Sequence, residues 1–462
     1  KDSMSGSFND LDVPPTLVSF AIAPGKVQNM ISPEFKEASS KVLKISIPRD
    51  ENEIPDFAAM KEIYAQVHEA ICKGHVIAAH SVRYGGIAEA ISKMCFGNQI
   101  GFEFACEQDN TALFAPDYGT LLLEVTDEVE LEGELLGETI EEPVISVNGK
   151  ELQLKDLFQV WDSPLENIFH TQADEPEEAP EIHCEINTTR RSSPAIAKPK
   201  VIIPVFPGNN CEYDSQRAFE KAGAEVEQLV FRNLTAQHVN ESIDALAKAI
   251  DDANILMIPG GFSAGDEPDG SGKFIVSVFS NPKISEATMN LLKNRDGLAL
   301  GICNGFQALI KLGLVPYGEI RPLTDQDPTL TFNNIGRHVS CYVRTKVVST
   351  LSPWLSECQL DDIHSIPVSH GEGKFYAPEE VLKELAMNGQ VATQYVDMEG
   401  SPSCAIEDNP NGSLWAVEGI TSPDGRVFGK MGHTERSGPY VGRNIDGNLN
   451  QPIFLSGVKY FQ

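Results

Sequence analysis

Three short, continuous apolar runs follow one another in the second half of the chain: residues 200–206 (KVIIPVF), 254–261 (NILMIPGG) and 298–303 (LALGIC). Runs of this kind are typical of parallel strands whose two faces are both covered. Helix-like segments separate them, among them 211–223, which ends at a glycine. The alternation predicts an α/β fold for residues 200–462, with a doubly wound, mostly parallel sheet whose functional sites form where the carboxyl ends of strands meet loops.

The first 170 residues have a different pattern. Residues 56–74 place apolar side chains at the i, i+3, i+4 spacing of an amphipathic helix that ends at Gly74. A strand-like run follows, and 85–97 predicts a second helix that starts at a glycine pair. Residues 119–161 predict short strands, with an Asn-Gly turn at Asn148 and Gly149. These elements indicate a separate α+β domain over residues 1–170.

Between the two regions, residues 171–199 accumulate Pro, Glu, Ala and Ser and lose hydrophobic periodicity, so we interpret them as a linker. The chain begins at Lys1 without an initiator methionine. We therefore expect it to be a piece of a longer protein, with a first domain that is truncated at its N-terminus.

The composition argues against several classes of function. With 67 acidic and 36 basic residues the net charge is −31, and no Lys/Arg stripe occurs, so we expect no nucleic-acid partner. The sequence contains no apolar run of a membrane-spanning helix and no signal-peptide core, which predicts a cytoplasmic protein without a membrane partner. Nine scattered cysteines without a CxxC pair predict reduced thiols and no metal site.

One cysteine lies at a chemically informative place. In GLALGICNGFQALIKLG (297–313), Cys303 lies where an apolar run gives way to a helix-like segment. A cysteine on such a strand-to-helix turn presents its sulfur to a cleft, and the N-terminus of the following helix favours the thiolate. Gly301 and Gly305 permit the crowded backbone of this turn. We therefore predict that Cys303 is a nucleophile.

A thiolate nucleophile needs a base, and the base needs a group that orients it. GKMGHTERSG (429–438) offers His433 and Glu435 at alternate positions of an expected strand, so both side chains can point the same way. Taken alone, Cys303 fits a buried structural thiol and His433 a core or turn histidine. Their combination favours a Cys-His-Glu triad.

The motifs GICNGFQ, MIPGGFSAGD and GHTER together resemble the class I glutamine amidotransferase domain of the phosphoribosylformylglycinamidine synthase family, in its large single-chain form. The segments IPVSHGEGKF (366–375) and 409–436 extend the resemblance beyond the triad. In the first domain, KDSMSG, VPPTLVSFA and HSVRYGGIAEAISKMCFGN resemble the aminoimidazole-ribonucleotide-synthetase-like half of the same family. The resemblance implies a flavodoxin-like second domain and an α+β first domain of the synthetase type.

The resemblance also implies an activity. Cys303 would attack the side-chain amide of glutamine, and His433, oriented by Glu435, would protonate the departing ammonia and later activate water. Backbone N–H groups of Gly261 and Asn304 would form the oxyanion hole, as the resemblance implies. Side chains of two further residues are implied to bind glutamine, namely Phe262 and Gln307.

The ammonia would serve the ATP-dependent conversion of formylglycinamide ribonucleotide to formylglycinamidine ribonucleotide in purine biosynthesis, a ligase reaction. The resemblance implies that the ATP and Mg²⁺ of this reaction, and the ribonucleotide site, belong to an N-terminal remainder of the synthase, and that this chain carries no cofactor. The chain alone would be at best a glutaminase.

Several residues depart from the family's usual pattern, among them His338 and Cys341, which stand where many relatives have an aromatic residue and an arginine. Thr434 stands in GHTER where many amidotransferases have proline, and Ser81 stands in HSVRYGG where relatives often have an aspartate that helps to hold a magnesium-bound nucleotide. Because serine is a weak Mg²⁺ ligand, we expect residues 1–170 to bind no nucleotide tightly. Three alternatives remain at this point: a glutaminase domain that serves another synthase, a cysteine hydrolase of the same superfamily, and a catalytically silent scaffold.

Overall fold

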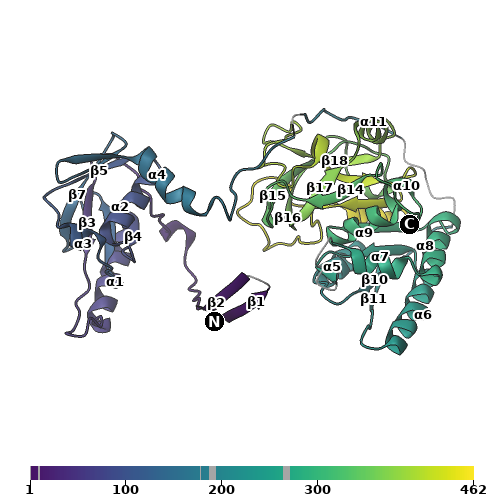
Figure 1. Ribbon diagram of the computed structural model, residues 1–462, viewed down its shortest axis with the longest axis horizontal. Helices are drawn as coiled ribbons and strands as arrows, with labels where there is room; N and C mark the ends of the chain where they lie inside the picture. Colours follow the sequence, from purple (N-terminus) through teal and green to yellow (C-terminus); the bar gives the residue numbers. More distant parts are fainter. Residues whose placement is uncertain (1, 9–10, 177, 187–193, 264–270) are drawn as a thin grey trace. The chain divides into compact units, whose positions relative to one another are not determined.

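The computed structural model describes residues 2–8, 11–176, 178–186, 194–263 and 271–462. The chain forms two compact units, Lys1–Asn167 and Ile168–Gln462 (Figure 1). None of the helices in these residues is long and apolar enough to cross a lipid bilayer.

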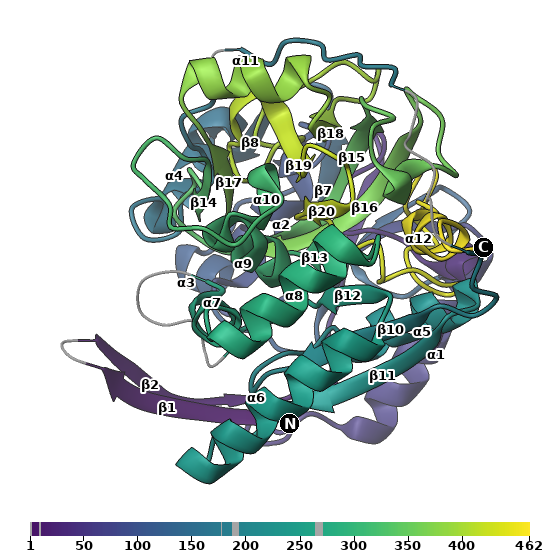
Figure 2. The same ribbon diagram turned by 90° about the vertical axis from the view of Figure 1, so that its right-hand side faces the viewer.

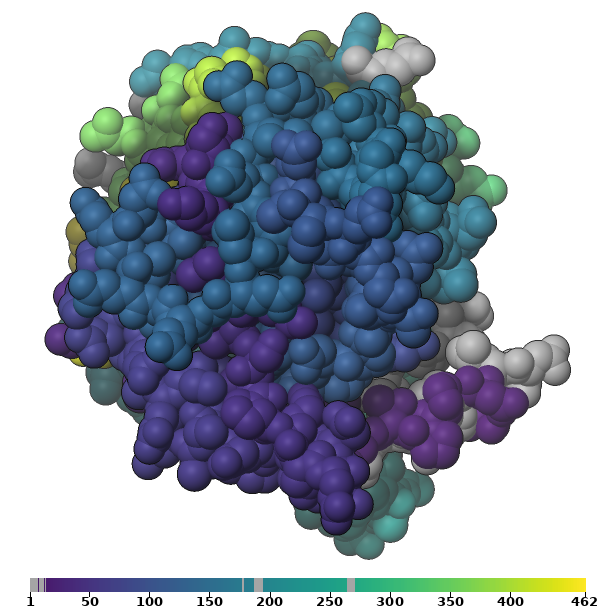
Figure 3. Space-filling view, turned by 90° about the vertical axis from the view of Figure 1, so that its left-hand side faces the viewer, coloured from purple at the N-terminus to yellow at the C-terminus, as the bar shows by residue number. Residues whose placement is uncertain are grey.

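A seven-stranded sheet forms the centre of the first unit. Its strand order is β4-β6-β3-β7-β5-β8-β9, so strands that are distant in sequence are neighbours, and in Figure 3 violet and blue segments from the early and late parts of this unit lie interleaved on one face. The strands are β3 (Lys41–Ile45), β4 (Val76–Ser81), β5 (Gly101–Phe104), β6 (Leu121–Val125), β7 (Glu134–Ile140), β8 (Val144–Val147) and β9 (Lys150–Gln153). The predicted Asn-Gly turn joins β8 and β9, and both of its residues have positive φ.

Helices cover both faces of this sheet. Successive strand residues point to opposite faces, so Val42 belongs to the core beneath α2 (Gly86–Phe96), whereas Leu43 belongs to the core beneath α1 (Phe57–Cys72). The predicted α+β composition and both predicted helices are therefore present. The remaining elements of this unit are the hairpin β1 (Asp2–Phe8) and β2 (Leu11–Val18), helices α3 (Asn110–Phe114) and α4 (Leu154–Asp162), and 3₁₀ turns at Val27–Asn29 and Ser163–Leu165.

The second unit contains a nine-stranded sheet of order β11-β10-β12-β13-β20-β19-β18-β15-β16. Its first five strands are parallel: β10 (Lys200–Val205), β11 (Glu225–Val230), β12 (Ile255–Ile258), β13 (Leu298–Ile302) and β20 (Val427–Lys430). In order of sequence this is the 2-1-3-4-5 arrangement of flavodoxin-like folds. The three apolar runs of the sequence are β10, β12 and β13, and β12 and β13 are buried along their whole length.

The other half of this sheet differs from the prediction of a mostly parallel sheet. From β20 onward, β19 (Val417–Thr421), β18 (Val391–Val396), β15 (Val339–Val347) and β16 (Ile363–His370) are antiparallel to their neighbours. The sheet is therefore mixed. The sequence did not reveal this, because these strands interleave polar with apolar residues and lack the continuous apolar runs that mark the parallel half.

Helices flank the parallel half on both faces. Since β-α-β crossovers are right-handed, α5 (Glu212–Ala222), which leads from β10 outward to β11, and α6 (Ala236–Asp252), which leads back to β12, lie on opposite faces. Helix α8 (Pro282–Asn294) lies beside α6 (Figure 2), and α12 (Ile453–Lys459) packs against α5. The remaining elements are α7 (Lys273–Phe279), α9 (Asn304–Leu312), α10 (Leu314–Tyr317), α11 (Glu379–Met387), the strand pair β14 (Thr329–Phe332) and β17 (Glu372–Tyr376), and 3₁₀ turns at Pro353–Leu355 and Leu414–Ala416.

Part of the segment interpreted as a linker packs against the second unit. Cys184 forms a bridge to Ser349, the amide of Gln394 donates to the Pro180 carbonyl, and Ile182 is buried in the core of this unit. These contacts are made largely through the backbone, which is why a sequence without hydrophobic periodicity can still lie ordered on a domain surface. Residue 177 and residues 187–193 of the predicted linker lie outside the described residues.

Candidate active site

The carboxyl ends of four parallel strands lie at one edge of the sheet. β10 leads to Cys211, β12 leads to Gly260 and Gly261, β13 leads directly to Cys303, and β20 leads to His433. Because the four strands are parallel, their ends lie at the same edge, as the rule for doubly wound sheets predicts. The site is therefore assembled by segments that are far apart in sequence.

Cys303 occupies a sharp turn between β13 and α9. Its backbone has φ 54° and ψ −108°, a combination that costs a non-glycine residue free energy and persists only where the surroundings impose it. Two backbone hydrogen bonds impose it here: the Cys303 N–H donates to the Lys430 carbonyl over 2.9 Å, and the Cys303 carbonyl accepts from the Gln307 N–H over 3.0 Å. The side chain is buried, and the thiol donates to the Ser369 carbonyl over 3.6 Å.

The glycines on either side of Cys303 are required by close packing. A Cβ at Gly305 would lie 1.9 Å from the Ile258 carbonyl oxygen at the end of β12, and a Cβ at Gly301 would lie 2.7 Å from the Gly305 carbonyl oxygen. Both distances are well below van der Waals contact. The sequence interpretation of Gly301 and Gly305 as residues that permit a crowded turn agrees with this geometry.

His433 and Glu435 lie in a turn rather than on the strand expected for them. β20 ends at Lys430, and the Arg436 N–H closes a turn by donating to the His433 carbonyl over 3.1 Å. The two side chains therefore do not point the same way because of strand alternation, as the sequence predicted. The turn nevertheless brings them together: His433 Nδ1 lies 2.6 Å from Glu435 Oε1. Both side chains are buried.

The electrostatics of this pair favour an imidazolium. Burial by itself would lower the pKa of His433, but the Glu435 carboxylate and the Cys303 sulfur raise this pKa well above its ordinary value. Burial would raise the pKa of Glu435, and the positive charge of His433 outweighs it and lowers this pKa. Glu435 therefore stays ionised and holds the ring by Nδ1. His433 Nε2 has no hydrogen-bond partner in the described residues and is free for a reacting group.

A cavity with an empty volume of about 410 Å³, part of it open to solvent, contains both Cys303 and His433 on its wall. Three other predicted site residues, Gly261, Phe262 and Gln307, also line it. Gly261 has φ 116°, and a Cβ there would lie 2.8 Å from the backbone of Asn209 and Asn210, so only glycine fits this turn.

The other predicted site residues have distinct surroundings. Asn304 is the first residue of α9, and its side-chain oxygen accepts from Ser263 over 3.3 Å. The amide nitrogen of Gln307 donates to the Glu372 carbonyl, so it secures the cavity wall. Phe262 is half exposed at the rim, and its backbone N–H is taken by the Gly208 carbonyl.

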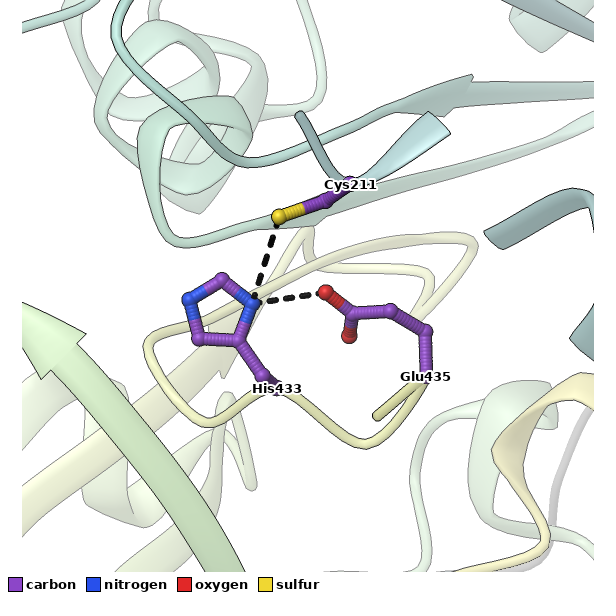
Figure 4. Close-up of side chains that lie close together, drawn as sticks. All are labelled: Cys211, His433 and Glu435. Atoms are coloured by element: carbon purple, nitrogen blue, oxygen red, sulfur yellow. Dashed lines mark hydrogen bonds and ion pairs between the residues drawn. The ribbon is translucent and has the colours of Figure 1, made fainter. Parts of the chain in front are cut away.

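The sequence interpretation did not single out several residues of this site. Cys211, fully buried after β10, places its sulfur 3.8 Å from His433 Nδ1 (Figure 4). The same sulfur lies 3.1 Å from a guanidinium nitrogen of Arg436. A Cβ at Gly260 would lie 2.8 Å from His433 Cε1. The position after an apolar run was the signal that could have identified Cys211, since the same signal identified Cys303.

The SHGEGKF motif forms the facing wall of the cavity through residues 369–372. The sequence motifs assigned no role to His370, and the structure buries this residue beside the site. Burial lowers the pKa of His370 to about 3, with smaller contributions from His433 and His338, so the ring is neutral. Its Nδ1 pairs with the Asn333 side-chain oxygen at 3.1 Å.

Cys211, His433 and Glu435 are the one group in the described residues whose ligand-type atoms lie close enough together, within 4.8 Å, to be considered for a metal ion. These residues fit a hydrogen-bonded network better than a metal site, because Nδ1 of His433 is already paired with Glu435 (Figure 4). In addition, the Arg436 guanidinium lies against the Cys211 sulfur. A fixed cation at the sulfur opposes the binding of a second one.

A model of the CobB/CobQ-like glutamine amidotransferase domain family matches residues 198–461, more than half of the chain. The chain belongs to this family. The first unit lies outside the matched residues, and the mixed sheet of the second unit is the class I glutamine amidotransferase fold.

The amidotransferase domain is similar in sequence to several proteins that share one name. The phosphoribosylformylglycinamidine synthase subunit PurQ of Methanococcus maripaludis strain S2 is 34% identical over 288 residues, which cover 57% of this chain and 97% of the relative. The subunit of the same name from Sulfurimonas denitrificans is 35% identical over 240 residues, 52% of this chain and 91% of the relative. Among solved structures, PurLQS from Thermotoga maritima is 26% identical with a TM-score of 0.42, over 57% of this chain and 100% of that one.

Proposed function

We propose that this chain is the glutaminase part of a phosphoribosylformylglycinamidine synthase and acts in purine biosynthesis. The observation that carries the proposal is the convergence of Cys303, His433 and Glu435 on one cavity in a domain whose relatives are PurQ subunits over nearly their whole length. A silent scaffold would not need a strained cysteine, an oriented histidine and an ionised glutamate at the same strand ends.

In the first step, the Cys303 sulfur attacks the carbon of the glutamine side-chain amide. The developing oxyanion receives hydrogen bonds from the backbone N–H groups of Gly261 and Asn304, which follow β12 and begin α9. His433, cationic and held at Nδ1 by Glu435, donates a proton from Nε2 to the nitrogen as the C–N bond breaks. Ammonia leaves, and glutamate remains as a thioester on Cys303.

In the second step, His433 acts as a base. Its Nε2, now unprotonated, takes a proton from a water molecule that attacks the thioester carbon. The carbon–sulfur bond breaks, glutamate leaves and the proton returns the His433–Cys303 pair to its first state. Glu435 remains ionised in its orienting role through both steps, because the charge and hydrogen bond of the adjacent His433 outweigh the effect of burial. Phe262 at the rim and Gln307 in the wall shape the space for glutamine.

The ammonia is consumed at a synthase site outside the second unit. We propose that the complete enzyme is an ATP-dependent ligase whose ATP, Mg²⁺ and ribonucleotide are bound by the synthase remainder, and that this chain carries no cofactor. The first unit fits this proposal as an aminoimidazole-ribonucleotide-synthetase-like domain: it is α+β, and Ser81 stands where a carboxylate would be needed for a nucleotide-bound metal. All nine cysteines are free thiols, in keeping with a reducing, cytoplasmic environment.

Three measurements on the purified chain test the proposal. We expect glutamate to form from glutamine, and a glutamine-analogue chloroketone to label Cys303, identified by peptide mass spectrometry. With ATP, Mg²⁺ and formylglycinamide ribonucleotide added, we expect no ADP. Absence of both glutamate formation and Cys303 labelling would overturn the glutaminase assignment, and stoichiometric ADP with the amidine product would overturn the division between this chain and the rest of the synthase.

A further inference from the structure

A buried ion pair lies behind the turn that carries His433. The ammonium of Lys430, the last residue of β20, is 3.2 Å from Glu418 Oε1 on the neighbouring strand β19, and neither side chain is exposed to solvent. Glu418 is held in turn by the Thr393 hydroxyl and by the Gly432 N–H, which donates to Oε1 over 2.7 Å. A buried pair of this kind stabilises little by itself, because desolvation offsets its attraction.

The remaining hydrogen bonds of Lys430 go to the two residues that flank His433. Its Nζ donates to the Gly432 carbonyl over 3.1 Å and to the Thr434 hydroxyl over 2.9 Å. With Glu418 as the third acceptor, all three N–H groups of the ammonium are used. The Thr434 hydroxyl in turn donates a hydrogen bond to the side-chain oxygen of Gln451 over 2.7 Å, and Gln451 lies just before α12.

Lys430 also reaches the nucleophile. Its backbone carbonyl accepts the Cys303 N–H over 2.9 Å, so one residue contacts both the turn of the base and the turn of the nucleophile. Gly432 fits closely against this arrangement, since a Cβ there would lie 2.9 Å from both Lys430 Nζ and Glu418 Oε1. The His433 N–H is fixed from the other side by the Pro367 carbonyl of β16 over 2.8 Å.

Building on the proposed function, we infer that Lys430 is a positioning residue that holds His433 in place. The Thr434 hydroxyl is the group through which the Lys430 ammonium contacts the turn that carries His433. Proline at position 434 would offer no hydroxyl to the ammonium, so the threonine that departs from the usual pattern is explained by the buried lysine four residues before it. Together they set the distance between His433 and Cys303, on which proton transfer depends steeply.

Thr434→Val tests this inference with the smallest change of shape. We expect kcat for glutamine hydrolysis to fall roughly tenfold with little change in KM, since the base is displaced while the cavity is kept. Thr434→Ser keeps the hydroxyl and should stay near the wild type. The matched control is Thr288→Val, which removes an equally buried hydroxyl that bonds only within α8. Lys430→Met should lower kcat by roughly a hundredfold.

A second readout distinguishes positioning from general support of the fold. We expect the rate of Cys303 alkylation at neutral pH to be lower in Thr434→Val than in the wild type, because a displaced His433 no longer lies where it can activate the sulfur. Equal alkylation rates and equal kcat in Thr434→Val and Thr288→Val would overturn the inference, and this holds even if Lys430→Met does not fold. A wild-type chain without glutaminase activity would contradict the proposed function, whereas the alkylation rates would still decide the role of Lys430.

Discussion

In the parallel half of the large sheet, four strands end at one edge, and Cys211, Gly260, Cys303 and His433 follow those ends. In the antiparallel half, the strands that contribute to the site do so along their length: β19 carries Glu418, and β16 carries the Pro367 carbonyl that fixes the His433 N–H. The first half supplies the groups that react, and topology alone brings these together. The second half supplies groups that hold the reactive ones in place, and these meet through side-chain packing.

The largest expected effect lies at the end of a parallel strand. Cys303→Ala should lower glutamine-dependent turnover by on the order of 10⁴-fold or more, because it removes the nucleophile and little buried volume. The control is Cys358→Ala, at a cysteine that does not follow a parallel strand. Burial is the main cause that raises the pKa of the Cys358 thiol to about 12, so this sulfur is inert at neutral pH. Glutamate release by both variants is the measurement, and a comparable loss in Cys358→Ala would break the contrast between the halves.

The second prediction separates the proton-transferring group from the one that orients it. His433→Ala should approach the loss of Cys303→Ala, whereas Glu435→Gln should cost roughly a hundredfold less, since the imidazole remains and only its orientation and charge are weakened. Steady-state kcat/KM across pH checks this. Indistinguishable losses in the two variants would mean that Glu435 does more than hold Nδ1.

The third prediction concerns the backbone between the two reacting side chains. Ala at position 260 would place its Cβ 2.8 Å from His433 Cε1, 3.2 Å from Cys211 Sγ and 3.4 Å from Cys303 Cβ. We expect Gly260→Ala to lower kcat by roughly 10- to 100-fold, since the imidazole must move. Gly438→Ala is the control, because its Cβ would meet only Val441 at 3.7 Å. Normal activity in Gly260→Ala would show that the site tolerates displacement of its base.

The same contrast explains what the sequence could predict. Continuous apolar runs are produced by burial on both faces, so β10, β12 and β13 could be identified, and with them the glycine-flanked turn at Cys303. The helix-periodic segments of the first unit could be identified for a similar reason. His433 and Glu435 could be chosen as residue types, although the strand expected for them is a turn.

The antiparallel half could not be predicted in this way. The pairing of Lys430 with Glu418 depends on the register between β19 and β20, where Gly419 is opposite Lys430, and nothing local in the sequence specifies that register. The burial of His370 depends likewise on Asn333 and on the cavity wall, which come from other segments. Such residues contribute no periodic pattern of their own, because their partners are distant in sequence.

The smallest expected effect belongs to this half and concerns stability. His370 has a folded-state pKa of about 3, below the value of about 6.5 expected in the unfolded chain. As the pH falls from 7 to 5, the unfolded chain therefore binds a proton that the folded domain does not, and the free energy of unfolding decreases by about 2 kcal/mol. The stability is complete above the unfolded pKa and is lost below it. His370→Gln should remove this part of the pH dependence.

Urea unfolding at pH 7, 6 and 5 measures the effect. A Trp161→Phe background restricts tryptophan fluorescence to the second unit, because Trp354 and Trp415 are then the remaining tryptophans. The control His183→Gln replaces an exposed histidine of the same unit and should keep the wild-type slope. If His370→Gln also kept the wild-type dependence of unfolding free energy on pH, the His370 imidazole would be accessible to protons in the folded state. The cavity wall formed by the antiparallel half would then be open to solvent. It would not be the water-free support that we infer for the groups at the parallel strand ends.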